Sequence, residues 1–337
     1  MRHLVSICVP AYNCEKTIFH TLQSIISQSY TNIEIIISDN NSTDKTRDVI
    51  KKFHDKRIKV YKCSKNIGYA RNINKCIGAS KGKYVCVFHA DDIYDRDIIE
   101  KQVEHMEKND VGAVFTLRRL IDENGKFIRN IDLPFEFKGE YIIGGKKTIF
   151  PSMLQYGNFL VCSSAMVRKK VYDEVGLWEE EPKIVEDQNM WLRILEKHRI
   201  IIINKQMMSY RKHLGQDSVM YNHRRMDISP EYVLYDEYIE KWKDIVKPEI
   251  MDKYNKMKSK AYLFCAVNAL LENNTEKFVL NMGESEELYK FKKTSVFYWI
   301  RNILYLPTGF TKPIIMILIN SMKFFGLQKK KDFLNYI

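Results

Sequence analysis

The chain has 337 residues, 45% of them hydrophobic and 28% charged, which is enough for roughly two domains with a sizeable core. Lys and Arg outnumber Asp and Glu by 54 to 42, so the formal net charge is +12. This composition excludes collagen, low-complexity sequence and a chain that is disordered throughout.

Membrane and redox signals are weak. The longest uninterrupted apolar stretch near the C-terminus covers only residues 314–319, well below the roughly 18 residues of a membrane-spanning helix. The short apolar segment at the N-terminus has no signal-peptide cleavage site, so we expect it to be a strand. Seven cysteines are scattered without a Cys-x-x-Cys pair, which predicts a protein of the reducing cytoplasm without a zinc site.

Strand and helix patterns alternate regularly over the first hundred residues. Apolar runs with few polar positions, separated by helices, predict an α/β fold with a doubly wound, mostly parallel sheet covered on both faces. The predicted strands are residues 4–10, 33–38, 58–61 and 84–88, and the predicted helices are residues 15–27, 44–53 and 70–79.

The pattern changes in the second half of the chain. Residues 132–142 resemble a loop, residues 176–197 a helix interrupted near Pro182, and residues 200–203 a short strand. From about residue 230 onward the pattern is helical throughout. We therefore expect a first domain over residues 1–225 and a helical, basic region over residues 226–337.

Polar loops follow three of the predicted strands. In open α/β sheets, ligands bind beyond the carboxyl ends of the strands. The adjacent acids Asp91 and Asp92 favour a divalent cation or ribose hydroxyls, although a solvated turn or a helix cap is an equally ordinary reason for them. Asp39, at the end of an Ile-rich strand, has the same two interpretations.

Two further features lie in the second half. Asp187 begins an amphipathic helix, where it is either functional or one of the acids that favour a helix N-terminus. His213 lies in a short extended run, and a lone His is most often a surface residue. Residues 144–148 and 82–83 complete no phosphate-binding loop, and no Gly-x-Gly-x-x-Gly follows the first strand.

Taken in chain order, these pieces resemble the motifs of the family 2 glycosyltransferases, which have the GT-A fold. The resemblance extends over roughly residues 1–218. Its motifs are VSICVPAYN (5–13), ISDNNSTD (37–44), NIGYARN (66–72), HADD (89–92), ED (186–187) and YRKH (210–213).

The resemblance implies an inverting enzyme with a nucleotide-diphosphate sugar donor, for which we guess UDP. It implies that Asp92 and His213 hold Mg²⁺ or Mn²⁺ on the diphosphate, while Asp187 is the general base. The family often has Asp where this chain has His89, which affects the choice of metal. The residues expected at the nucleotide are Pro10, Ala11, Tyr12, Asn13, Asp39, Asn41, Arg71 and Asp91.

The sequence also bears on two rival functions. A sugar nucleotidyltransferase needs a Gly-rich, Arg-containing loop after the first strand, and residues 10–13 lack it. A degenerate domain that only binds nucleotide sugars, membranes or nucleic acid is favoured by the basic tail and disfavoured by the retained acids. We expect a glycan or lipid-linked acceptor from bacterial surface polysaccharide or oligosaccharide assembly, and no nucleic acid partner.

The tail carries most of the excess charge. Residues 290–337 contain nine Lys and Arg against one Asp, and they include aromatic residues such as Trp299. Cations such as Lys292, Lys293 and Arg301 beside apolar residues predict peripheral attachment to the anionic inner face of the cytoplasmic membrane. The alternative is that these helices pack on the transferase domain or form a homo-oligomer interface.

Overall fold

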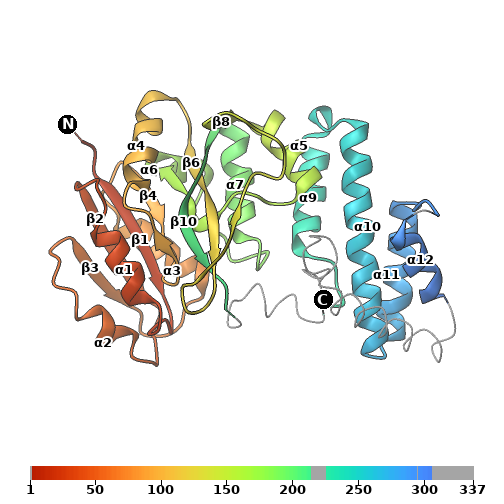
Figure 1. The fold of residues 1–337 in the computed structure, drawn as a ribbon, viewed down its shortest axis with the longest axis horizontal. Helices are drawn as coiled ribbons and strands as arrows, with labels where there is room; N and C mark the ends of the chain where they lie inside the picture. Colours follow the sequence, from red (N-terminus) through yellow and green to blue (C-terminus); the bar gives the residue numbers. More distant parts are fainter. Residues whose placement is uncertain (1, 214–224, 294, 306–337) are drawn as a thin grey trace. The chain divides into compact units, whose positions relative to one another are not determined.

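The computed structural model describes residues 2–213, 225–293 and 295–305 (Figure 1). The chain forms two compact units, which divide between His213 and Leu214. The division that we predict at residues 225 and 226 stays a prediction, because residues 214–224 lie outside the described part. The same holds for the predicted properties of residues 306–337.

The first unit is built on one mixed sheet whose first four strands are parallel, which confirms the predicted α/β class. The strands are β1 (Val5–Ala11), β2 (Ile33–Asp39), β3 (Ile58–Lys62), β4 (Tyr84–Val87), β5 (Ile93–Tyr94), β6 (Ala113–Ile121), β7 (Phe127–Ile131), β8 (Tyr141–Gly144), β9 (Met166–Arg168) and β10 (Ile200–Arg211). Their order is β3-β2-β1-β4-β9-β6-β10-β5, with β7 beside β6 and β8 beside β10.

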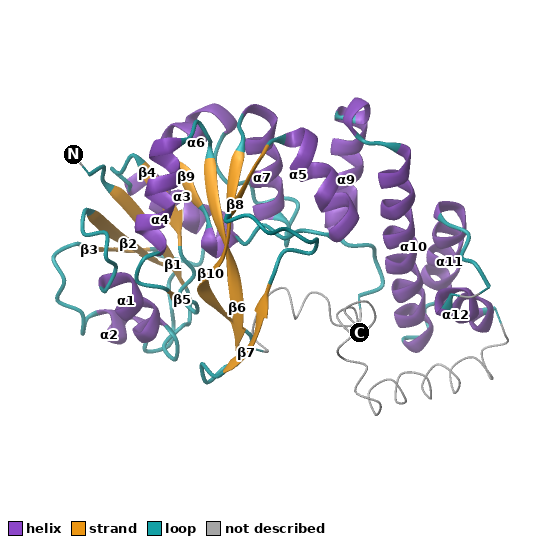
Figure 2. Cartoon of the chain, turned by 45° about the horizontal axis from the view of Figure 1, so that its top comes forward, coloured by secondary structure: helices purple, strands orange, loops and turns teal. Residues whose placement is uncertain are grey.

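Helices pack around this sheet (Figure 2). They are α1 (Ile18–Ile26), α2 (Thr46–Ile50), α3 (Tyr69–Ala79), α4 (Ile98–Lys108), α5 (Lys146–Tyr156), α6 (Lys169–Val175) and α7 (Glu186–Lys197), with a 3-10 turn at Cys162–Ser164. Side chains of β1 alternate between the faces: Ile7 and Val9 share a core cluster with α1 and α4, whereas Cys8 contacts Cys76 of α3. Both faces are therefore covered, as the apolar strands predict.

The seven elements from β1 to β4 agree with the predicted ones to within three residues at each end, whereas β5 and α4 were not predicted. The later part differs from the prediction. Strands β6 to β9 were not predicted; β7, β8 and β9 pair antiparallel with their neighbours, and β10 is one strand of 12 residues rather than two short runs. The predicted helix over residues 176–197 forms only from Glu186 onward. β9 has only three residues and β7 is largely exposed, so neither has the apolar run that marks a central strand.

The second unit contains helices α9 (Pro230–Lys241), α10 (Pro248–Leu271), α11 (Thr275–Leu288) and α12 (Val296–Leu304), with a 3-10 turn at Lys243–Ile245. Its core joins Phe264 of α10, Met282 of α11 and Phe297 of α12. Within the described ranges, no helix combines the length and the hydropathy that crossing a membrane requires.

Arg301 corrects one detail of the predicted membrane surface. Its side chain is buried, and Nη2 donates hydrogen bonds to Ser259 Oγ (3.1 Å), to the Ser285 carbonyl (2.9 Å) and to the Tyr289 carbonyl (2.9 Å). The expectation that Arg301 faces a membrane is wrong, because its guanidinium is buried and hydrogen-bonded inside the helical unit. Trp299 of the same helix is 56% exposed.

Candidate active site

The loops that follow β1 and β2 are hydrogen-bonded to one another. The backbone N–H of Asn13 donates to Ser42 Oγ (3.0 Å), and the N–H of Thr43 donates to Asn13 Oδ1 (2.9 Å). Asn13 and Asn41 have φ angles of 46° and 62°, a left-handed conformation that Asn adopts more readily than most residues. The two strand ends thus form one polar rim, on which the ring of Tyr12 is exposed.

Asp39 lies at the centre of this rim. It is fully buried and pairs in register with Ala11 of β1, one residue after the half-buried Pro10. Its Oδ1 accepts from the N–H of Ser42 (3.1 Å), and its Oδ2 lies 3.3 Å from Arg47 Nε. Oδ2 accepts no hydrogen bond from any described residue, so it has capacity for a ligand hydroxyl.

The start of α3 is attached to the β2 loop. Asn40 Oδ1 accepts from the N–H of Ile67 (2.8 Å), and Asn40 Nδ2 donates to the Gly68 carbonyl (3.3 Å). Gly68 precedes the helix with φ 84°, a conformation that favours glycine. Arg71 follows in the first turn of α3, where it is exposed and forms an ion pair with Glu180. Its position puts a cation at the edge of the rim.

A cluster of three metal-binding residue types follows β4. One ligand atom from each of His89, Asp91 and Asp92 lies within 4.8 Å of the others. Thr21 of α1 donates its hydroxyl to the Asp92 carbonyl (2.7 Å), and the N–H of Arg211 donates to Asp92 Oδ1 (3.0 Å). The cluster is therefore held from two sides, by α1 and by the end of β10.

The two acids of this cluster have opposite electrostatic environments. Burial raises the pKa of Asp92 well above its usual range, and the charge of Asp91 raises it further. Burial acts in the same direction on Asp91, but the hydrogen bond from His213 and the charges of His213 and His89 together outweigh it and lower the pKa of Asp91. Burial lowers the pKa of His89, which keeps its imidazole neutral.

These residues fit a divalent cation. Asp92 Oδ2 is buried and accepts no hydrogen bond from a described residue, and the neutral His89 offers a nitrogen lone pair. Two carboxylates with an imidazole suit a cation such as Mn²⁺. His213 is outside the three-residue cluster, and its Nε2 lies 3.1 Å from Asp91 Oδ2. The assignment of His213 to the metal and of Asp91 to the ribose stay predictions.

Asp187 lies in the first turn of α7, where its Oδ1 accepts from the N–H of Gln188 (2.8 Å). Burial raises the pKa of the Cys162 thiol, and the charges of both Asp187 and Asp92 raise it further. The same two carboxylates also act on Arg118. Asp187 and Asp92 therefore both lie near Cys162 and Arg118.

Sequence reasoning missed several residues of this site. Tyr69 places its hydroxyl 2.8 Å from His89 Nε2 and 3.6 Å from Cys162 Sγ, and the Arg118 guanidinium lies 5.0 Å from the centre of the Tyr210 ring. Tyr69 and Tyr210 lie inside the motifs already noted, so their positions could have been inferred. Arg118 and Cys162 have no local signal, because only the packing of distant strands brings them here.

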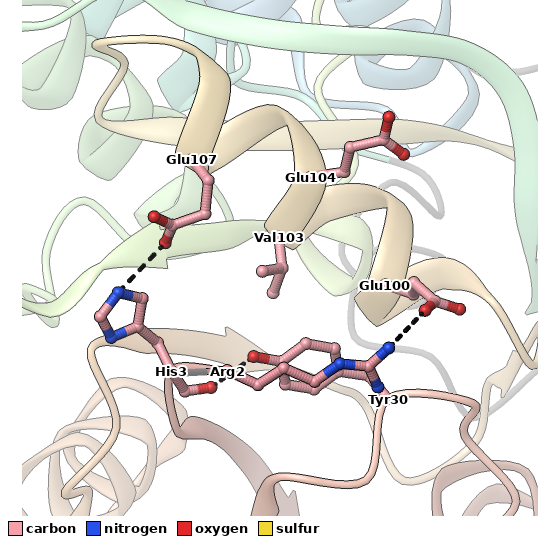
Figure 3. Close-up of a pocket in the computed structure, with 7 residues that line it drawn as sticks. All are labelled: Arg2, His3, Tyr30, Glu100, Val103, Glu104 and Glu107. Carbon is pink, nitrogen blue, oxygen red and sulfur yellow. Dashed lines mark hydrogen bonds and ion pairs between the residues drawn. The ribbon is translucent and has the colours of Figure 1, made fainter.

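A separate cavity of about 260 Å³ lies at the opposite end of β1 (Figure 3). It is lined by Arg2, His3, Tyr30, Glu100, Val103, Glu104 and Glu107. Its polar groups pair with each other, since Arg2 bonds Glu100 (3.3 Å) and the Tyr30 hydroxyl donates to the His3 carbonyl (2.6 Å). This cavity shares no residue with the site described above.

Residues 6–176 match the model of the family described as Glycosyl transferase family 2. Among curated proteins, the chain is 34% identical over 195 residues to the UDP-Glc:alpha-D-GlcNAc-diphosphoundecaprenol beta-1,3-glucosyltransferase WfaP of Escherichia coli. The alignment covers 58% of this chain and 71% of WfaP.

Solved structures show the same fold. Residues 1–349 of TarS from S. aureus, in complex with UDP-GlcNAc, match with a TM-score of 0.56 at 18% identity, over 86% of this chain and 93% of that one. The mannosyltransferase PcManGT from Pyrobaculum calidifontis, in complex with GDP-Man and Mn²⁺, matches with a TM-score of 0.56 at 16% identity, over 90% of this chain and 85% of that one. These matches support a GT-A fold for the chain.

Proposed function

The chain belongs to glycosyl transferase family 2 and is a glycosyltransferase, and from that premise we propose an inverting transfer from a nucleotide-diphosphate sugar, with UDP as the nucleotide. The acceptor is a hydroxyl of a glycan or lipid-linked sugar in bacterial surface polysaccharide or oligosaccharide assembly. WfaP supports this choice, because its name specifies a UDP-linked donor and a lipid-diphosphate acceptor.

The observation that carries the proposal is the cluster of His89, Asp91 and Asp92, with Asp187 acting on the same neighbouring side chains. We assign Mn²⁺ or Mg²⁺ to this cluster, with Asp92 and His89 as ligands, Asp91 either as a ligand or at the ribose, and His213 as a further ligand or as the partner of Asp91. A bound cation neutralises the charge that develops on the leaving diphosphate. His213 holds the Asp91 carboxylate in position through its hydrogen bond.

The nucleotide is assigned to the rim formed by the ends of β1 and β2. Asp39 Oδ2, which lacks a hydrogen-bond donor among the described residues, suits a hydroxyl of the ribose or an N–H of the base. The exposed ring of Tyr12 suits stacking on the base. Arg71 suits the diphosphate. The remaining contacts are assigned to Pro10, Ala11, Asn13 and Asn41.

Asp187 is assigned as the general base. The acceptor hydroxyl oxygen attacks the anomeric carbon from the side opposite the diphosphate, and the bond from that carbon to the phosphate oxygen breaks. The electron pair of the broken bond stays on the diphosphate, while the proton of the hydroxyl passes to the Asp187 carboxylate. Attack from the opposite side inverts the anomeric centre.

We further propose that the protein acts at the inner face of the cytoplasmic membrane as a peripheral protein. The support lies in α12 and the residues before it, where Trp299 and Tyr305 are each 56% exposed and Lys292 and Lys293 are exposed cations. An exposed aromatic beside cations suits the interface of an anionic bilayer.

The test is a thermal-shift screen of the full chain against nucleotide sugars, with and without Mn²⁺. We expect one UDP-sugar to raise the melting temperature only when Mn²⁺ is present, and to be hydrolysed slowly under the same conditions. A nucleoside-diphosphate without a sugar serves as the control for binding without chemistry. If no nucleotide sugar raises the melting temperature and none is hydrolysed, the proposed donor chemistry is wrong.

A further inference from the structure

The hairpin of β6 and β7 brings two arginines, Arg118 and Arg129, to the edge of the candidate active site. We propose that these two arginines bind a phosphate group of the acceptor. The inference rests on the proposed glycosyl transfer, and it adds the side chains that recognise the acceptor and the charged group that they bind. It is independent of the residues assigned to the nucleotide.

The hairpin is attached directly to the loop that carries the metal cluster. Arg211 Nε donates to the Asp91 carbonyl (2.9 Å), and Arg211 Nη1 donates to the Glu123 carbonyl (3.0 Å) and the Asp122 carbonyl (3.3 Å) in the hairpin turn. Its own N–H bonds Asp92. One buried side chain thus fixes the distance between the hairpin and the cluster.

Arg118 has unused hydrogen-bonding capacity next to that cluster. It is half-buried, and its Nε is inaccessible to water and has no partner among the described residues. The Tyr210 ring supports the guanidinium at 5.0 Å, which fixes the plane in which its N–H groups can donate. A buried guanidinium N–H without an acceptor is costly, and an anionic ligand removes that cost.

Arg129 adds a second positive charge at the same place. Arg129 is exposed and pairs in register with Leu120, which is two residues from Arg118 along β6. Burial lowers the pKa of Arg118, and at this separation the charge of Arg129 lowers it further. Like charges at neighbouring positions of a hairpin are destabilising. Two arginines at diagonal positions on one face of the hairpin therefore form a site that an anion stabilises.

The place of the pair in the sheet favours the acceptor over the donor. The nucleotide rim lies on β1 and β2, whereas Arg118 lies on β6, beyond β4 and β9 in the strand order. The metal cluster at the end of β4 lies between the two. Arginine forks match the oxygens of phosphate in a bidentate way, which favours a phosphate over an uncharged sugar. The phosphate is either the diphosphate of a lipid-linked sugar or a phosphodiester of a polyol chain.

The experiment compares acceptors that differ only in charge, using the full chain and the donor found in the screen. The probes are undecyl-diphosphate N-acetylglucosamine, the neutral undecyl glycoside of the same sugar, and a ribitol-phosphate oligomer. The variants are Arg118→Met, Arg118→Lys and Arg129→Met. Lys138→Met serves as a matched control, because Lys138 has a side chain 91% exposed and lies outside the hairpin.

We expect each Met variant to raise KM for one phosphate-bearing acceptor about tenfold, the effect of one lost charge-assisted contact. Under the same conditions KM for the neutral glycoside and the affinity for UDP with Mn²⁺ should change less than about twofold, and Arg118→Lys should fall between. The acceptor whose KM responds identifies the source of the phosphate.

Equal losses on charged and neutral acceptors overturn the inference, because they show that Arg118 only balances the charges of Asp92 and Asp187. Unchanged KM in Arg129→Met, which is exposed and should not disturb folding, also overturns it. If the wild-type protein transfers sugar to none of these probes while hydrolysing the donor, the phosphate acceptor is wrong and the donor assignment stands. Absence of both transfer and hydrolysis overturns the proposed function itself.

Discussion

The carboxylates of Asp92 and Asp187 have different surroundings in the site. Asp92 is buried and its pKa is raised, which marks it as a carboxylate that needs a cation to stay ionised. Asp187 lies in the first turn of α7, where the helix N-terminus favours its negative charge. A carboxylate at this position is suited to accept a proton from an acceptor hydroxyl.

The first prediction concerns that base. Asp187→Asn keeps the shape of the side chain but cannot accept a proton, so turnover should fall about 100-fold or more. Binding of the nucleotide sugar, measured by calorimetry, should stay within a few fold of wild type. Glu186→Gln is the matched control and should keep most of its activity. If Asp187→Asn retains more than about a tenth of wild-type turnover and Glu186→Gln does not, Glu186 is the base.

The second prediction concerns the cation. Asp92→Ala removes a buried carboxylate ligand, and we expect it to abolish the Mn²⁺-dependent part of UDP binding. His89→Asp replaces an imidazole by a carboxylate, so it should tighten that binding and improve the response to Mg²⁺, which prefers oxygen ligands. Titration calorimetry of UDP with each metal measures both effects.

Tyr69→Phe is the control for the His89 variant, because it removes the 2.8 Å hydrogen bond to the imidazole and the 3.6 Å contact with Cys162 Sγ without changing a proposed metal ligand. It should leave the order of metal preference unchanged. Unchanged UDP affinity in Asp92→Ala with Mn²⁺ present would contradict the assignment of Asp92 to the metal. Weaker binding in His89→Asp would contradict the direction predicted for His89.

At the scale of the elements, a single acid interrupts the apolar strand β2. Glu34 has a buried side chain and accepts hydrogen bonds from Ser6 Oγ (2.6 Å), Lys59 Nζ (2.7 Å) and the N–H of Lys81 (2.6 Å). It therefore joins β2 to both neighbouring strands and to the turn before β4. The strand tolerates the acid because three donors satisfy it.

The third prediction concerns the stability of this junction. Burial by itself raises the pKa of Glu34, but the bonds from Lys59, Ser6 and Lys81 outweigh it and lower the pKa below its usual value. A lowered pKa stabilises the folded state above the unfolded pKa of about 4.3 and loses that effect as the pH falls through the folded value. Glu34→Gln should therefore cost about 1–3 kcal/mol at pH 7.

Urea unfolding of wild type and Glu34→Gln at several pH values measures this difference. The gap in free energy of unfolding should be constant above about pH 5 and should shrink below the usual glutamate pKa. Glu104→Gln is the control, because Glu104 pairs with Lys101 and Lys108 on the surface and should change stability little. A gap that is independent of pH would show that the charge of Glu34 contributes nothing.

At the scale of the whole molecule, the chain contains a transferase unit and a helical unit with its own core. In the helical unit, Phe297, Ile300 and Leu304 of α12 are buried against α10 and α11. Arg301 of α12 donates hydrogen bonds to the Ser285 carbonyl of α11 and to the Ser259 hydroxyl of α10. These residues are therefore unavailable to a membrane. Trp299 and Tyr305 point out of that core and remain exposed.

The fourth prediction concerns membrane binding by the full chain. We expect the protein to sediment with vesicles that contain phosphatidylglycerol at low salt, and to bind less as the salt concentration rises. Trp299→Ala should weaken this binding several-fold because it removes an interfacial aromatic. Tyr156→Ala, an exposed aromatic of the transferase unit, is the control. Equal binding by wild type and Trp299→Ala would remove Trp299 from the membrane surface.

Much of this protein could be predicted from local sequence. The strands up to β4 and the helices between them follow from apolar runs and periodicity, because a parallel strand buried on both faces must be apolar along its length. The polar loops after β1, β2 and β4 follow as well, since each is adjacent in sequence to its strand. For these reasons the fold class and the positions of Asp39, Asp91 and Asp92 were accessible without coordinates.

Only the tertiary structure decided which distant residues share the site. Cys162 and Arg118 reach it because β9 and β6 pair across the sheet, and Arg301 is buried because three helices meet around it. The sequence around these residues gives no sign of these positions, since a short antiparallel strand or a single buried arginine does not alter the local hydrophobic pattern. Contacts of this kind depend on chain segments far apart in sequence, and packing alone determines them.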